Sequence, residues 1–195
     1  MNAKSEIMNR LRSSLADSPA APEVPRAYRR TSSSSAEEVR EMLVDRLVDY
    51  RASVHSASAA ELPELLDSLI DGPVVLPEGL DPSWLPEVQE VRDPLDAACV
   101  VTSSTVSCAE TGTIILTGQP SEGQRKLSLI PDHHICVVPA DTIVELFPEA
   151  WTRVGEAGLH GPVTMISGPS ATSDIELERV EGVHGPRRLD VVILG

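Results

Sequence analysis

A turn rich in hydroxyl groups begins at Gly168, where an apolar stretch ends and Gly168-Pro169 predicts a sharp change of direction. The residues that follow include Ser170, Thr172, Ser173 and Asp174, which are all good helix caps. A turn from a strand into a helix leaves backbone N–H groups unpaired, so this segment could bind an anion or a carboxylate. A purely structural cap is the alternative, because the carboxylate of Asp174 could itself occupy these N–H groups.

The end of the same segment adds an imidazole and two guanidinium groups. His184 stands just before Gly185-Pro186 and could act as an acid or base, or orient a ligand. A structural hydrogen bond is the other interpretation of His184. Arg187 could hold a carboxylate with two hydrogen bonds, or form a surface ion pair. Since neighbouring residues of a strand point to opposite faces, only one of Arg187 and Arg188 can serve a given pocket.

A second segment with chemical potential is CAETGTI, residues 108–114. Glu110 stands at the expected bend between two apolar strands, where it could be a nucleophile or a general base. It could equally pair with Arg187 or Arg188. Glycine at position 112 permits a positive φ or the close approach of a ligand, and Thr111, Gly112 and Thr113 are therefore predicted to contribute to ligand binding.

Two adjacent histidines, His133 and His134, begin a predicted strand in LIPDHHICVV. They should face opposite sides and cannot both hold one metal ion from a regular strand. We expect His134 to reach a pocket and His133 to lie on the surface. No histidine spacing typical of a metal site is present, so no metal is predicted.

Composition excludes several other classes of function. There is no GxGxxG and no GxxxxGK[ST] motif, so the sequence predicts neither a Rossmann-type dinucleotide site nor a P-loop nucleotide site. The three cysteines stand apart in apolar runs, which predicts buried thiols and no cysteine-held iron–sulfur cluster in this chain. A formal net charge of −14 disfavours nucleic acid as a partner. No apolar run approaches the roughly 18 residues of a membrane span, so a cytoplasmic location is expected.

The elements that must position these residues alternate between strands and helices. Apolar periodicity predicts helices over 4–16, 36–50, 58–70, 140–154 and 173–179. It predicts strands over 52–55, 73–77, 88–91, 98–108, 113–117, 133–138 and 162–167, with a last strand in RRLDVVILG. This order favours an α/β fold with a mixed, mostly parallel sheet and helices on both faces. We expect residues 1–34 to form a helix and a linker rich in proline and serine, and residues 35–195 to form one domain.

Three segments, GPSATSDIELERVEGVHGPRRLDVVIL, AETGTI and LIPDHHICVV, resemble the lactate utilization protein C family, also called the LUD domain family. The resemblance covers roughly residues 97–194, and Ala171 departs from it where many relatives carry a larger polar or basic residue. It implies a fold like that of the sugar-phosphate isomerase and CoA-transferase superfamily. It also implies a place in a three-protein system that oxidises lactate to pyruvate, in which partner proteins A and B carry the iron–sulfur clusters.

The expected role is therefore that of a subunit without a redox centre, which binds a small carboxylate, another anion or a partner. A free-standing acyl-transfer, CoA-transfer or isomerase-like enzyme that uses Glu110 is the alternative, and a sensor of lactate-like anions is a third possibility. All site assignments depend on the turns around Glu110 and Ser170 meeting at one edge of a sheet to form a shared polar cleft.

Overall fold

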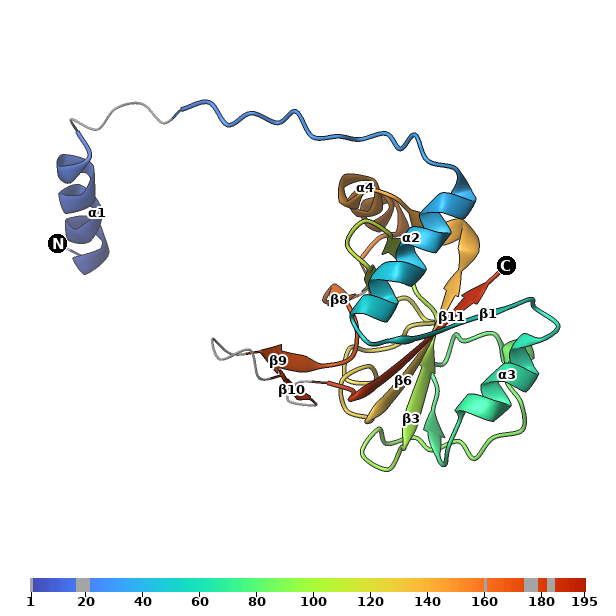
Figure 1. Cartoon of the computed structure of the whole chain (residues 1–195). Coiled ribbons are helices and arrows are strands. Elements are labelled where there is room, and N and C mark those ends of the chain that lie inside the picture. The colour runs from blue at the N-terminus through green and yellow to red at the C-terminus, as the bar shows by residue number, and fades with distance from the viewer. Residues whose placement is uncertain (1, 17–21, 160, 174–178, 182–184) are drawn as a thin grey trace.

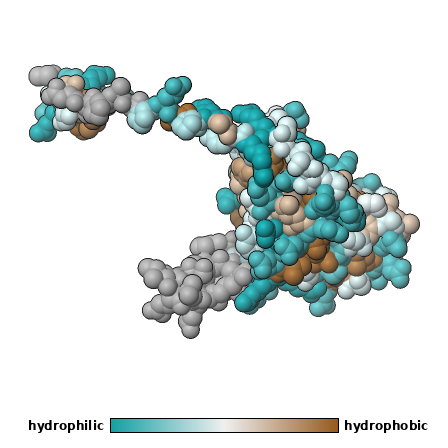
Figure 2. Space-filling view, turned by 45° about the horizontal axis from the view of Figure 1, so that its top comes forward, coloured by the Kyte–Doolittle hydropathy of each residue, from teal (hydrophilic) through white to brown (hydrophobic). Residues whose placement is uncertain are grey.

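The computed structural model describes residues 2–16, 22–159, 161–173, 179–181 and 185–195. Helix α1 (Ala3–Ser14) stands at the N-terminus, and none of its residues is buried. Its apolar side chains Ile7, Met8 and Leu11 are exposed. An extended stretch from residue 22 leads from this end of the chain to the body, and Figures 1 and 2 show it leaving the body as an arm.

A five-stranded parallel sheet forms the centre of the body. Its strands, in spatial order, are β1 (Ser53–Ala57), β11 (Arg188–Leu194), β6 (His133–Pro139), β3 (Cys99–Thr102) and β2 (Val74–Val75). The three inner strands are almost completely buried, as expected for strands that are covered on both faces. The predicted strand over 88–91 is reduced to a single bridge between Val74 and Glu90.

Two helices cover opposite faces of this sheet (Figure 1). Helix α2 (Ala36–Asp49) begins with a capping box, in which Ser35 and Glu38 bond to each other's backbone N–H groups. Its apolar stripe packs on one face of the sheet, and helix α3 (Leu62–Leu69) packs on the other face. The short 3-10 turn η1 (Pro82–Trp84) follows later in the chain and contributes Trp84 to the α3 side. The prediction of a mixed α/β fold with helices on both faces is thus confirmed.

A smaller mixed sheet lies on the α2 side of the first sheet. Its strands, in spatial order, are β7 (Ile143–Val144), β4 (Val106–Cys108), β5 (Thr113–Leu116) and β8 (Thr164–Ile166). Ile114 and Leu116 pack toward α2, whereas Ile115 faces helix α4 (Phe147–Ala157) on the outer side. The fold therefore has a second core, between β4, β5 and α4.

Two predicted elements need correction in this region. The single strand expected over 98–108 is two strands, because the chain leaves the large sheet after Thr102 and enters the small one at Val106. The helix expected over 140–154 begins only at Phe147, so Asp141 lies in the 3-10 turn η2 (Ala140–Thr142) and does not cap the helix. Pro148 stands in the first turn of α4, where its missing N–H costs nothing.

The helix predicted over 173–179 is also wrong where the structure describes it. Strand β9 (Ala171–Ser173) pairs antiparallel with β10 (Arg179–Glu181) in a separate two-stranded ribbon. The predicted strand over 162–167 exists as β8, which is an edge strand of the smaller sheet and leaves the apolar side chain of Met165 exposed. Among the described helices, none has the length and apolarity needed to cross a bilayer.

Candidate functional site

One row of side chains crosses the α2 face of the large sheet. The parallel register aligns Val75 with Val100, Val100 with His134, and His134 with Leu189. Residues aligned in this way project from the same face of a sheet. Two connected cavities lie over this row, and they share the lining residues Arg125, Ser128 and Thr164.

The smaller cavity, which we call the inner pocket, has a volume of about 270 Å³. His134 and Leu189 belong to its lining, together with Gly168 and Ser170 from the turn after β8. The larger cavity, which we call the outer groove, has a volume of about 1140 Å³ and reaches over Val75 at the other end of the row. The structure thus brings three of the predicted ligand-binding residues, His134, Gly168 and Ser170, to one pocket.

His134 is a buried and uncharged group in this pocket. Its Nε2 lies 2.8 Å from Oγ1 of Thr102 on the neighbouring strand. Burial, and to a smaller extent the nearby His133, lower the pKa of His134 to about 3. The imidazole is therefore neutral at physiological pH, so it can exchange hydrogen bonds with a ligand but cannot supply a positive charge.

The positive charge near the inner pocket comes from Arg125, which lines both cavities. A guanidinium group suits a carboxylate or a phosphate because it offers parallel N–H donors. The inner pocket therefore combines a neutral imidazole, serine hydroxyls and a nearby cation. Together these groups can bind a small anion.

The turn after β8 is held in place from both sides. The backbone N–H of Ser170 donates to the carbonyl of Pro186 over 2.8 Å. Thr172 and Ser173 follow in β9, whose backbone pairs with β10, so these residues do not begin a helix. An anion site built on a helix N-terminus is therefore not formed by them. Asp174 and His184 lie outside the described residues.

The turns after β4 and β8 meet, but Thr111, Gly112 and Thr113 of the first turn line neither the inner pocket nor the outer groove, where they were predicted to contribute to ligand binding. Thr113 Oγ1 accepts a hydrogen bond from Thr111 Oγ1 at 2.8 Å and lies 2.9 Å from Ser167 Oγ. Gly112 and Gly168 both have positive φ, 58° and 85°, and both pack against the end of α2 at Tyr50. The close approach that Gly112 permits is thus to helix α2.

Glu110 lines neither of the two cavities. Its carboxylate is half exposed and accepts a hydrogen bond from Arg29 of the N-terminal arm at 2.7 Å. Arg29 also lies 3.8 Å from Glu145, and Ser32 donates to the same Glu145 carboxylate. The Ser32 hydrogen bond is the main reason that the pKa of Glu145 is lowered. Glu110 thus helps to fasten the arm to the body, and its partner is neither Arg187 nor Arg188.

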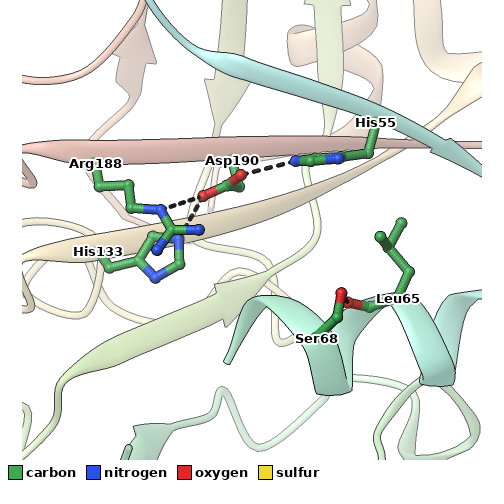
Figure 3. A network of polar contacts seen from close by, with 6 residues as sticks. All are labelled: His55, Leu65, Ser68, His133, Arg188 and Asp190. Atoms are coloured by element: carbon green, nitrogen blue, oxygen red, sulfur yellow. Dashed lines mark hydrogen bonds and ion pairs between the residues drawn. The ribbon is translucent and has the colours of Figure 1, made fainter. Parts of the chain in front are cut away.

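The two arginines at the start of β11 have separate roles. Arg187 forms an exposed ion pair with Asp132 over 2.7 Å and lines neither cavity. Arg188 donates to Asp190 over 2.8 Å. Only Arg188 therefore joins a larger network, which Figure 3 shows.

This network surrounds the buried carboxylate of Asp190. His55 Nε2 and His133 Nε2 lie 2.7 Å from its two oxygens (Figure 3). Burial raises the pKa of Asp190, but the hydrogen bonds from His133 and His55 and the charge of Arg188 outweigh it and lower the pKa to about 2. The prediction that His133 lies on the surface is therefore wrong: it is buried, and it faces the α3 side of the sheet, opposite to His134.

Sequence reasoning missed Asp190 and His55. The available signal was a single carboxylate inside an apolar strand, LDVVIL, which has to find partners when it is buried. Within the described residues, no group of three or more histidine, cysteine, aspartate or glutamate side chains is placed to hold a metal ion. All three cysteines are buried and free, and burial raises the pKa of Cys99 to about 11 and that of Cys136 to about 12.

The comparisons with known proteins agree on one family. The LUD domain pattern matches residues 87–194. A protein named Lactate utilization protein C from Deinococcus radiodurans is 42% identical over 99% of this chain and 96% of its own length. Proteins of the same name from Shouchella clausii and, as Lactate utilization protein C 1, from Bacillus mycoides are 35% and 38% identical, over 48% of this chain and 42% of theirs.

A solved structure has the same fold. The crystal structure of a DUF162 family protein from Deinococcus radiodurans superposes with a TM-score of 0.70 and 34% sequence identity. The superposition covers 83% of this chain and 99% of the other.

Proposed function

The chain belongs to the LUD domain family, and from this premise we propose that it takes part in lactate utilization. In this proposal it is a subunit without a redox centre in an iron–sulfur system that oxidises lactate to pyruvate. The iron–sulfur clusters belong to partner proteins A and B. The names of its relatives, all Lactate utilization protein C, support the process.

The observation that carries a molecular role is the inner pocket. Neutral His134 and the Ser170 segment line it, and Arg125 stands where it opens into the outer groove. We infer that a small carboxylate, lactate or pyruvate, binds here, with Arg125 near the carboxylate and His134 near the hydroxyl or keto oxygen. A neutral imidazole suits that task because it can donate or accept a hydrogen bond at an oxygen.

Direct binding tests this role. Purified protein is titrated with L-lactate, D-lactate and pyruvate by calorimetry, beside the variants His134→Gln and Ser170→Ala. Each variant should weaken binding roughly five- to tenfold, the usual effect of one lost hydrogen bond. Ser68→Ala is the matched control, because Ser68 lies on α3, on the other face of the sheet, and bonds only locally to the Leu65 carbonyl (Figure 3). If none of the three compounds binds, the inner pocket is not a lactate or pyruvate site.

A genetic experiment tests the process separately. A strain that lacks this protein should fail to grow on lactate and should regain growth with the intact gene. Affinity purification of the tagged protein from lactate-grown cells should recover iron–sulfur proteins. Normal growth of the deletion strain on lactate, with no iron–sulfur protein recovered, would refute the proposed membership.

The alternative enzyme based on Glu110 has less support. A nucleophile or base must reach its substrate, but Glu110 is bonded to Arg29 and lines neither cavity. We expect Glu110→Gln to leave lactate and pyruvate binding unchanged. If this variant keeps its unfolding stability but no longer binds lactate or pyruvate, Glu110 contributes to the binding site.

A further inference from the structure

We propose that the outer groove binds a phosphorylated, hydroxyl-bearing metabolite of about nucleotide size, at a site that adjoins the inner pocket and shares Arg125 with it. Three cations supply the phosphate contacts: Arg92, Arg125 and Lys126. The proposal does not rest on the role in lactate utilization, because it follows from the charges and the size of the groove.

The first argument is the distribution of cations in an acidic protein. The chain has 30 acidic and 16 basic residues, so most cations can find a carboxylate nearby. Among the described side chains of residues 35–195, five arginines lie between 2.6 and 3.9 Å from a carboxylate: Arg40, Arg46, Arg153, Arg187 and Arg188.

Arg92, Arg125 and Lys126 differ from those five. The structure gives no carboxylate partner to any of the three within its described part, and all three line the outer groove. Cations that a protein leaves unpaired around one concave surface raise the local concentration of anions there. A phosphate group is well matched to two neighbouring cations, of which Arg125 offers a planar fork and Lys126 a point charge.

The second argument is size. The outer groove, at about 1140 Å³, has about four times the volume of the inner pocket, at about 270 Å³. Sites for compact organic ligands commonly span roughly 300 to 1000 Å³. A three-carbon acid would leave most of the groove filled with water, whereas a nucleotide-sized ligand would reach from Arg125 toward Val75.

The third argument is the rigidity of one wall. The buried carboxylate of Glu122 accepts hydrogen bonds from the backbone N–H groups of Thr117 and Gln119 at 2.7 and 2.9 Å, and from Thr105 at 2.6 Å. These bonds fix the loop that leads into Arg125. A wall that is fixed before binding loses little conformational entropy when a ligand arrives.

The wall formed by residues 75–78 and 90–92 carries two carboxylates as well as Arg92. Glu78 and Glu90 are exposed and line the groove, and the structure describes no cation bonded to either of them. Free carboxylates there can accept hydrogen bonds from ligand hydroxyl or amino groups. The two walls touch at one end, where the backbone N–H of Gly79 donates to the carbonyl of Pro120 at 3.1 Å. A ligand that carries both phosphate and hydroxyl groups fits this mixed lining of cations and carboxylates.

The test uses the full-length protein and three defined probes: inorganic pyrophosphate, ADP and adenosine. Calorimetry at low salt should show binding of pyrophosphate and ADP, with ADP the tighter of the two, and much weaker binding of adenosine. The double variant Arg125→Gln/Lys126→Gln should weaken ADP binding at least about tenfold, since two charge-assisted contacts are lost. Lys4→Gln/Arg12→Gln removes the same charge from α1 and should leave ADP binding unchanged.

Two results would overturn the proposal. One is the absence of pyrophosphate and ADP binding at millimolar concentration in the folded wild-type protein. The other is equal loss of ADP affinity in both double variants, which would mean that net charge alone attracts the nucleotide. Lactate binding is measured through His134→Gln in the same preparation, so a failure of the inner pocket and a failure of the outer groove can be told apart.

Discussion

Thr113 Oγ1 lies 2.9 Å from Ser167 Oγ, and this contact joins two turns that stand 54 residues apart in the chain. Thr113 follows the turn that carries Glu110, and Ser167 begins the turn that lines the inner pocket. The N-terminal arm is fastened at Glu110 through Arg29. The contact therefore links the attachment of the arm to the pocket wall through one short stretch of backbone.

The strength of this contact can be measured with a double-mutant cycle. Thr113→Val and Ser167→Ala should each lower the free energy of unfolding by about 1 kcal/mol. The two losses should couple by about 0.5 to 1 kcal/mol, because both variants remove the same hydrogen bond. Urea unfolding of the two single variants and the double variant at pH 7 gives the coupling. Strict additivity would show that the two hydroxyls do not interact in solution.

Gly112 and Gly168 should resist substitution by alanine. Both have positive φ, and an added Cβ would lie 2.7 Å from the Cβ of Arg46 at position 112 and 2.6 Å from the Cβ of Tyr50 at position 168. Each Gly→Ala variant should lose roughly 1 to 3 kcal/mol of unfolding free energy by urea titration. Gly155→Ala is the control, since nothing lies within 4 Å of its added Cβ inside α4, and it should gain up to about 1 kcal/mol. Unchanged stability in both test variants would contradict the close packing against α2.

Local patterns in the sequence were sufficient for much of the fold. Ser35 followed three positions later by Glu38 is a capping-box pattern and indicates where α2 starts, and Pro63 is a residue that suits the first turn of α3. The division of the stretch 98–108 between two sheets was not predictable from the same kind of signal. Both halves are apolar and rich in β-branched residues, and Ser103-Ser104-Thr105 contains no glycine or proline to mark the exit. Periodicity reports that a strand is present but not to which sheet it belongs.

For the polar contacts, too, the direction of a side chain could be predicted from neighbouring residues, whereas its partner could not. The opposite orientation of His133 and His134 follows from the alternation of side chains along a strand, and the structure confirms it. Their partners could not be inferred that way, because His55, His133 and Asp190 come from three strands far apart in the sequence. Arg29 is likewise separated from Glu110 by 81 residues. Only the fold determines such pairs.

The buried imidazole of His134 should remain neutral across the physiological range. Its pKa is lowered to about 3, so its NMR signals should not shift between pH 5 and 8 in the folded protein. In the unfolded chain a histidine titrates near 6.5, so the unfolded state binds more protons between about pH 3 and 6.5. Stability from this group is full above pH 6.5 and falls as the pH drops through that window. His134→Gln should reduce this acid sensitivity, and a His134 signal that titrates near pH 6.5 in the folded state would contradict the burial.

Asp190 should be the carboxylate whose loss destabilises the large sheet most. Its side chain is 1% exposed and accepts bonds from His55, His133 and Arg188. Asp190→Asn removes the negative charge, and the amide NH2 of asparagine would face the N–H donors of the histidines and Arg188. We therefore expect the free energy of unfolding, measured with urea at pH 7, to fall by about 3 kcal/mol. Asp132→Asn is the matched control: Asp132 pairs with Arg187 on the surface, and the exposed pair should cost less than about 1 kcal/mol.

The pH dependence of Asp190→Asn separates the charge of Asp190 from a packing defect. The folded pKa of about 2 lies below the ordinary 3.8, so the contribution of the carboxylate is complete above pH 3.8 and disappears as the pH falls through 2. That difference corresponds to about 2 kcal/mol. The gap in unfolding free energy between wild type and Asp190→Asn should therefore narrow by about this amount between pH 5 and pH 2. A gap that stays constant over this range would mean that the substitution acts through packing, and that the two histidines and Arg188 do not stabilise a charged Asp190.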